Sequence, residues 1–213
     1  YYQILKLNSK KVASIGTLGV KSKNIKFNLS NTTIDPIKLS QILKKLKYKK
    51  IDNVIMEASS HGLKQNRLDG LLFSSGIFTN LSQDHLDYHK NLKDYLNAKL
   101  YLFENLIKKK GNIITDEKIP EFKKIKKIAS NKGLKIYTLS DKKNNFSILS
   151  HTFNGESQML KIRFNNTIQN INLNLIGKIQ LKNLLMAILA ANQSNIKITK
   201  ILKVIRKIKS VKG

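Results

Sequence analysis

The chain has 213 residues and a formal net charge of +27, with 40 Lys and Arg against 13 Asp and Glu. Such a length can bury a sizeable core, and an apolar content of 41% argues against intrinsic disorder. The absence of Cys excludes a disulfide framework and thiolate sites, and no apolar run reaches the roughly 18–20 residues of a membrane span. No signal-peptide pattern is present. Because the chain begins with Tyr1 rather than Met and stops at Gly213, we expect a piece of a longer protein.

The positive charge is spread along the sequence rather than gathered in one segment. Lys occurs throughout, together with many Asn and Ile, and these are the residues that AT-rich codons encode. Arg, which nucleic-acid-binding surfaces favour, occurs only as Arg67, Arg163 and Arg206. A basic nucleic-acid-binding domain therefore stays an alternative, and an anionic small-molecule substrate fits the charge equally well.

Apolar runs and helical periodicities alternate along the first part of the chain. Strands are predicted at 12–16, 54–56, 76–78, 112–115 and 134–139, and helices at 1–7, 36–47, 92–107 and 120–130. The apolar runs at 54–56 and 76–78 are typical of buried strands. This alternation predicts an α/β fold with a mostly parallel sheet flanked by helices.

The period of the pattern changes to two between about residues 145 and 175, with turn signals at Asn154-Gly155 and Asn165-Asn166. This pattern predicts a small antiparallel β-meander attached to the sheet. Two helices are expected to follow, at 180–191 and 198–208. Because the sequence contains no internal repeat and no low-complexity linker, we expect residues 1–213 to form one domain.

A first polar cluster, Glu57-Ala-Ser-Ser-His61-Gly62, directly follows a predicted strand. Ligands of open α/β sheets bind beyond the carboxyl ends of the strands. A carboxylate at the end of an apolar strand is costly unless a cation or hydrogen-bond donors meet it, and a solvated strand end is the alternative. Ser60-His61 does not indicate a hydrolase, because neighbours on an extended chain point to opposite faces and no G-x-S-x-G elbow is present.

A second polar cluster, Thr79–His89, follows the next strand and holds two Asp and two His within six residues. Such a group could bind a cation, and His85 and His89 have the helical i, i+4 spacing that zinc sites also use. The alternative is a helix N-terminus capped by Ser82 or Asp84, with the His side chains exposed. The spacing alone leaves both interpretations open.

Lys99 lies within the predicted helix 92–107. It shares one apolar stripe with Leu92, Leu96, Phe103 and Leu106. Burying an ammonium group is expensive, so this position indicates a paired, neutral or chemically modified amine. A lysine whose stem packs while its ammonium reaches water is the alternative.

These clusters together resemble the Mur ligases and, within them, the MurE-type UDP-N-acetylmuramoyl-tripeptide synthetases. The resemblance rests on Met56-Glu-Ala-Ser-Ser-His-Gly-Leu63 with Gln65-Asn-Arg67, on Phe78–His89 and on Asn97-Ala-Lys99, with Ile15–Gly19 and Asn31-Thr-Thr33 in matching order. It covers nearly the whole chain as the central, ATP-binding domain. It implies an ATP-dependent amide ligase that adds the third amino acid to UDP-MurNAc-L-Ala-D-Glu through an acyl phosphate.

The resemblance also implies roles for individual residues. Glu57 and His85 match magnesium ligands, and Lys99 matches the catalytic lysine that becomes carbamylated and bridges toward magnesium. Six positions match those that hold the UDP-MurNAc-dipeptide: Asn31, Thr32, Thr33, Ser59, Gln65 and Arg67. Asn183 matches the ATP-contacting Asn of the G-x-x-N-x-x-N helix, in which Gln180 replaces the first Asn and can make the same hydrogen bonds.

Two departures from the family pattern concern the ends of the chain. The phosphate loop G-T-N-G-K-S/T does not occur in residues 1–213, and we expect it, with the first strand, upstream of Tyr1. The C-terminal domain, which carries the pocket for the incoming amino acid, is expected after Gly213. Residues 1–213 are therefore expected to be a central domain without its N-terminal and C-terminal partners, and inactive alone.

The implied cofactor is Mg²⁺, with ATP as a substrate. The implied partners are the UDP-MurNAc-dipeptide and a diamino acid, either meso-diaminopimelate or L-Lys, with no nucleic acid. We expect a cytoplasmic monomer that serves cell-wall biogenesis, cell shape and cell division. The alternative within the class is another Mur-type ligase, of the cyanophycin or folylpolyglutamate type.

Overall fold

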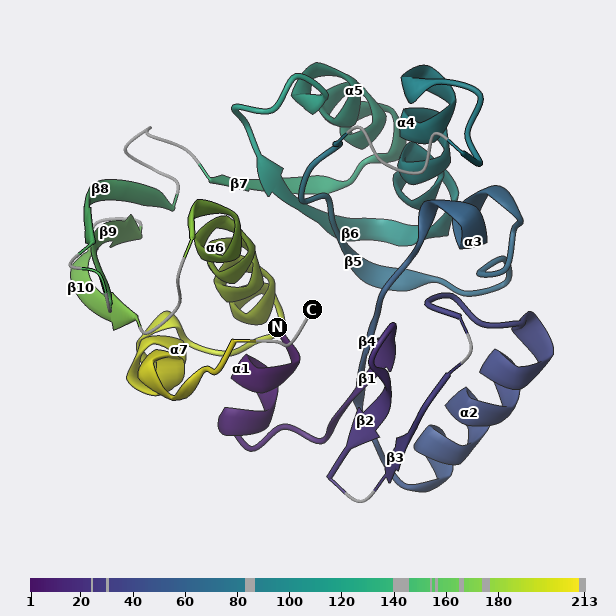
Figure 1. Cartoon of the computed structure of the whole chain (residues 1–213), viewed down its shortest axis with the longest axis horizontal. Coiled ribbons are helices and arrows are strands. Elements are labelled where there is room, and N and C mark those ends of the chain that lie inside the picture. The colour runs from purple at the N-terminus through teal and green to yellow at the C-terminus, as the bar shows by residue number, and fades with distance from the viewer. Residues whose placement is uncertain are drawn as a thin grey trace.

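The computed structural model describes residues 1–23, 25–29, 31–82, 87–139, 146–153, 155, 157–164, 167–173 and 177–210. Three sheets and the helices between them make up these residues (Figure 1). The α/β fold class predicted from the sequence is confirmed.

Sheet A has the strand order β3-β2-β1-β4. Its members are β1 (Val12–Gly16), β2 (Gly19–Ser22), β3 (Ile25–Phe27) and β4 (Asn53–Met56). β1 and β4 are parallel, whereas β2 and β3 add antiparallel edges that the sequence did not predict. The helix α2 (Pro36–Tyr48) buries Leu39, Ile42 and Leu46 in the core of this sheet.

Sheet B consists of three parallel strands, β5 (Phe73–Ile77), β6 (Ile107–Asp116) and β7 (Lys135–Leu139). Helices α4 (Leu92–Tyr101) and α5 (Phe122–Lys132) pack on one face, and their core includes Phe103, Ile113 and Ile125. The expected helix 92–107 is divided, because α4 continues as a π-helical turn over Leu102–Leu106.

Sheet C is the predicted meander of β8 (Ser147–Phe153), β9 (Gln158–Phe164) and β10 (Thr167–Leu173). The helix α6 (Lys178–Gln193) lies beside this sheet, between it and sheet B (Figure 1). Its apolar side chains share one core with α1 (Tyr2–Leu7), α7 (Ile198–Val204) and the 3-10 turn Ile205–Lys207. A short helix, α3 (Ser60–Lys64), follows β4 and was not predicted.

Sheets A and B do not pair with each other in the described ranges. β4 pairs only with β1, and β5 pairs only with β6. Their outer edges instead line a cavity of about 1360 Å³. The prediction that 54–56 is a buried strand is wrong for this reason, since Val54 is 36% exposed.

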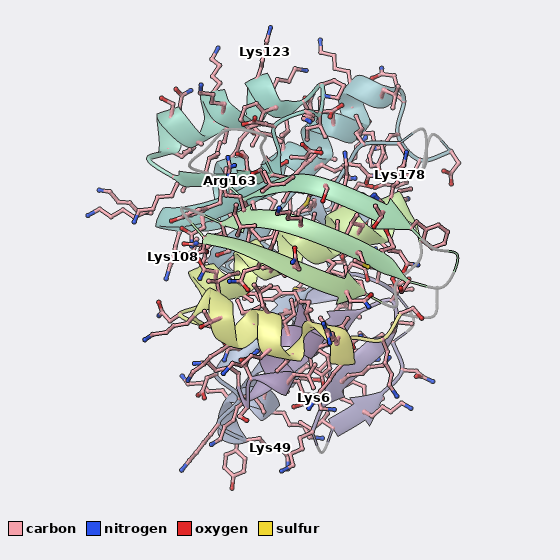
Figure 2. All side chains as sticks on the ribbon, turned by 90° about the vertical axis from the view of Figure 1, so that its left-hand side faces the viewer. Lys6, Lys49, Lys108, Lys123, Arg163 and Lys178 are labelled. Carbon is pink, nitrogen blue, oxygen red and sulfur yellow. The ribbon has the colours of Figure 1, made fainter. Side chains whose placement is uncertain are left out.

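Basic side chains extend from many elements of the molecule. Figure 2 shows this for Lys6 of α1, Lys49 after α2, Lys108 of β6, Lys123 of α5, Arg163 of β9 and Lys178 of α6. The charge is thus distributed over the whole of this face rather than along one element. None of the helices in the described part of the chain has the length and apolar character needed to cross a membrane.

Candidate active site

The cavity beside β4 and β5 collects most of the site residues predicted from the sequence. Those that line it are Asn31, Thr32, Thr33, Glu57, Ser59, Gln65, Arg67 and Lys99. They come from the segment before α2, from the end of β4, from α3 and the turn after it, and from α4. Residues distant in the sequence therefore face one space, although their individual roles stay predictions.

Hydrogen-bond donors meet the carboxylate of Glu57 at the end of β4. Its Oε2 accepts hydrogen bonds from the backbone N–H and the Oγ1 hydroxyl of Thr17, both at 2.9 Å. The backbone of Gly16 runs close beneath the same side chain, so a Cβ at this position would lie 2.5 Å from Oε2. The Glu57 carboxylate is thus oriented by hydrogen-bond donors while the side chain stays exposed, so features of both alternatives are present at this strand end.

Thr33 is the centre of a polar network that holds the segment before α2 against α3. It is only 3% exposed, and its Oγ1 accepts hydrogen bonds from the backbone N–H and the hydroxyl of Ser59, both at 2.9 Å. The guanidinium of Arg67 donates to the Thr33 carbonyl at 2.7 Å. Gly62 packs so closely that a Cβ there would lie 2.4 Å from Thr33. The network fixes three predicted substrate-binding residues relative to one another.

Lys99 is half-buried and reaches from α4 into the cavity. Its Nζ donates to the carbonyl of Asn80 at 2.8 Å and lies 4.9 Å from the ring centroid of Tyr95 and 5.6 Å from that of Phe78. Leu96, Phe103 and Leu106 of the predicted stripe are buried, whereas Leu92 is 38% exposed. The apolar surroundings expected from the sequence are thus present around a lysine that still meets polar atoms.

Where the second cluster is described, it differs from the interpretation of a capped helix with exposed histidines, whereas the cation site stays a prediction. Asp84 and His85 lie outside the described residues, so the proposed role of His85 stays a prediction. α4 begins at Leu92 and is capped by Asn91, so a helix that starts near Ser82 is wrong. His89 precedes α4 and is 1% exposed, so it is neither helical nor exposed.

The family model of the Mur ligase middle domain matches residues 1–191. The chain belongs to the Mur ligase family. Within this family it is similar to the UDP-N-acetylmuramoyl-L-alanyl-D-glutamate–2,6-diaminopimelate ligase of Rickettsia montanensis, with 36% identity over 97% of the chain and 44% of the relative. The ligase of the same name from Leptospira interrogans is also 36% identical, over 93% of the chain and 40% of that protein. The chain thus spans less than half the length of these Mur ligases.

Solved structures show the same Mur ligase fold. A UDP-N-acetylmuramoyl-L-alanyl-D-glutamate–2,6-diaminopimelate ligase superposes with a TM-score of 0.89 at 22% identity, over the whole chain and 43% of that structure. MurF from Acinetobacter baumannii superposes with a TM-score of 0.73 at 13% identity, over 100% of this chain and 44% of that structure. An FPGS–AMPPCP complex superposes with a TM-score of 0.71 at 11% identity, over 98% of this chain and 59% of that structure.

The two residues expected to contact ATP are not brought to the cavity. Gln180 and Asn183 are exposed near the beginning of α6. The opposite end of this helix, at Gln193 and Ser194, is the part that lines the cavity. Between them, Lys182 forms an ion pair with Asp116 at 2.7 Å and so ties the start of α6 to the carboxyl end of β6. An ATP contact by this Mur ligase helix stays a prediction.

Among the described residues, no group of three or more His, Cys, Asp or Glu side chains is arranged to hold a metal ion. Glu57 nevertheless presents an exposed carboxylate in the cavity. Mg²⁺ in phosphoryl-transfer sites is typically held by one or two carboxylates together with substrate phosphates and water. Glu57 suits this mode of binding, to which a carbamate on Lys99 would add hard oxygen ligands.

Gly16→Ala in the full-length protein is expected to reduce kcat/KM for ligation by about tenfold to a hundredfold, because the new methyl group displaces the Glu57 carboxylate and misplacement of about 1 Å has effects of this size. Steady-state kinetics measure the change. Gly155→Ala is the matched control: its φ of +91° strains an alanine, but nothing lies within 4 Å of the added atom. Equal losses of activity in both variants would contradict the importance of the Gly16–Glu57 contact.

Proposed function

We propose that the full-length protein is the ATP-dependent ligase that adds a diamino acid to UDP-MurNAc-L-Ala-D-Glu in the cytoplasm, and thereby serves cell-wall synthesis, cell shape and division. The observation that carries the proposal is that Glu57, Arg67, Lys99 and the Thr33 network line the same cavity. The names of the Rickettsia and Leptospira relatives support it and favour meso-diaminopimelate over L-Lys as the third residue. Purified full-length protein should release phosphate from ATP only when the UDP-dipeptide and the diamino acid are both present. If neither meso-diaminopimelate nor L-Lys is ligated, the proposal is refuted.

We further propose that residues 1–213 are the central domain of this ligase without its first strand and phosphate loop. The facing edges of β4 and β5 support this proposal, because each has room for one more strand across the cavity. Tyr1 lines the same cavity. A chain that continues from Tyr1 toward these edges would join sheets A and B into one sheet.

The proposed reaction activates a poor acyl donor. A D-Glu carboxylate oxygen attacks the γ-phosphorus of ATP and ADP leaves; the amine of the third amino acid then attacks the acyl phosphate, and phosphate leaves. Phosphoryl transfer depends mainly on positioning and charge neutralisation. Arg67 can hold carboxylate or phosphate oxygens of the substrate bidentately, and Thr33 keeps this side chain oriented.

Glu57 and Lys99 would form the anionic side of the site. The neutral amine of Lys99 can attack CO₂ and lose a proton, which leaves a carbamate with one negative charge. Mg²⁺ bound by Glu57 and this carbamate would neutralise charge on the transferred phosphoryl group. The two donors from Thr17 keep the Glu57 carboxylate in place for this purpose.

Arg67→Ala in the full-length enzyme is expected to raise KM for the UDP-dipeptide by about tenfold or more, since a hydrogen bond to a charged group contributes roughly 1.5–3 kcal/mol. KM for ATP should change by less than about threefold, because Arg67 contacts the Thr33 segment rather than the predicted ATP-binding positions. Initial-rate kinetics in each substrate provide the test, with Arg163→Ala on β9 as the control for lost charge. A larger effect on ATP than on the UDP-dipeptide would remove Arg67 from the substrate site.

The net charge keeps one other class of function in view, a basic nucleic-acid-binding domain. Such binding would weaken steeply as salt increases, because it depends on the release of counterions from phosphates. We expect only weak, salt-sensitive binding of oligonucleotides alongside specific binding of the UDP-dipeptide. Tight oligonucleotide binding at physiological salt without affinity for the UDP-dipeptide would favour the alternative.

A further inference from the structure

His89 lies between α3 and α4 and does not line the cavity. Its ring is 1% exposed, and its Nε2 is 2.9 Å from the Oγ of Ser60, the first residue of α3. On the other side the ring stacks on Tyr95 of α4, with centroids 5.0 Å apart and an interplanar angle of 24°. A buried histidine thus contacts both helices.

Each of these contacts leads to a residue of the proposed site. Ser60 directly follows Ser59, which caps α3 and bonds Thr33. The Tyr95 ring lies 4.9 Å from the Nζ of Lys99, one helical turn further along α4. His89 is therefore a buried link between the proposed substrate-binding end of α3 and the lysine on α4.

A second link between the two helices is the ion pair of Lys64 with Asp94. Both side chains are about one-third exposed, and exposed pairs of this kind contribute little to stability. A buried hydrogen bond is more consequential, because its loss leaves a polar atom without water or a partner. The position of α3 relative to α4 should therefore depend more on His89 than on Lys64.

The surroundings of His89 favour its neutral form. Burial lowers the pKa of His89, and the charges of Lys64 and His61 lower it further, while Asp94 acts in the opposite direction. The Nδ1 atom is 3.6 Å from the carboxylate of Asp94, which favours the proton on Nδ1. Nε2 then accepts a hydrogen bond from the Ser60 hydroxyl.

We infer that His89 is a positioning residue of the ligase: it holds the beginning of α3, and with it Ser59, at a fixed place relative to Lys99. The inference rests on the proposed function for its effect on catalysis. It does not require His89 to touch a substrate. Its action runs through Ser60 on one side and Tyr95 on the other.

Amide replacements separate the two ring nitrogens of His89. A glutamine can place its amide close to the position of Nε2, whereas an asparagine reaches only the position of Nδ1. In the full-length enzyme, His89→Ala and His89→Asn should raise KM for the UDP-dipeptide about tenfold, the equivalent of roughly 1.4 kcal/mol. His89→Gln should stay within about threefold of the wild type.

Ser60→Ala should raise KM in the same direction as His89→Ala, and the double variant should be no worse than His89→Ala alone, because the hydrogen bond that Ser60→Ala removes is already lost in His89→Ala. Leu100→Ala is the control for a merely structural effect, since Leu100 is 4% exposed on α4 and packs in the core of sheet B. Leu100→Ala should lower the melting temperature. At assay temperatures at which this variant is still folded, its KM for the UDP-dipeptide should equal that of the wild type. Additive effects of Ser60 and His89, an equal KM change in Leu100→Ala, or no rescue by glutamine would each overturn the inference.

A readout that needs no substrate separates this inference from the proposed function. Hydrogen exchange at the Gly62 and Leu63 amides, which bond Ser59, should become faster in His89→Ala but not in His89→Gln. Amides of α5 should stay unchanged in both. If the wild-type protein shows no ligation, the proposed function fails. If hydrogen exchange at these amides is unchanged in His89→Ala, the role of His89 in holding α3 is refuted independently.

Discussion

Lys99→Ala in the full-length enzyme is expected to lower kcat for ligation by about a hundredfold or more, the size of effect seen when one charge-stabilising group is lost from an active site. Lys99 reaches the cavity from α4, among Tyr95, Phe78 and the carbonyl of Asn80. Only the uncharged form of a lysine amine reacts with CO₂, so the proposed carbamate would form from the deprotonated amine of Lys99. The alanine variant would remove the proposed carbamate and its two oxygens.

Short-chain carboxylic acids distinguish a carbamate from an ammonium group. Added acetate or propionate should restore part of the activity of Lys99→Ala, because it supplies the missing oxygens to the cavity. Lys93→Ala, on the first turn of the same helix and exposed, is the control and should keep wild-type activity. Near-normal turnover in Lys99→Ala would contradict the carbamate, and so would rescue by methylamine but not by acetate.

Residues 1–213 expressed alone are expected to show no ATP-dependent ligation, a loss of about a thousandfold or more relative to the full-length enzyme. Their sequence contains no G-T-N-G-K-S/T loop, whose backbone N–H groups and lysine would hold the ATP phosphates. Phosphate release in the presence of the UDP-dipeptide and diamino acid measures the activity. Circular dichroism of the same sample establishes whether it is folded. If folded residues 1–213 ligate at a higher rate than full-length Lys99→Ala, the expectation is refuted.

The sequence predicted the elements whose signals are local. α5 shows a clear helical period with Gly133 at its end in the left-handed region, at φ +63°, and β8 to β10 show the alternation of a meander. β2 and β3 were missed because they are only four and three residues long, and α3 because five residues cover barely more than one turn. Short elements depend on tertiary contacts rather than on their own pattern.

The candidate site was only partly visible in the sequence. The position of Glu57 was predicted from the rule that ligands bind at the carboxyl ends of strands. The hydrogen bonds of Thr33 with Ser59 and Arg67 were not predicted, because they join residues more than 20 positions apart in the sequence. The position of His89 was also unforeseen, since its spacing from His85 suggested a metal site. A buried contact with Ser60 across 29 residues has no local signal.

The facing edges of β4 and β5 also bear on the order of folding. In the domain organisation proposed above, a strand that precedes Tyr1 would pair with both β4 (Asn53–Met56) and β5 (Phe73–Ile77). It would be synthesised before either partner, and the loops that it closes would span more than 50 residues. Such non-local pairing is slow, because loop entropy is lost before the strands gain their contacts. The strand made first on the ribosome would be among the last to find its place in the sheet.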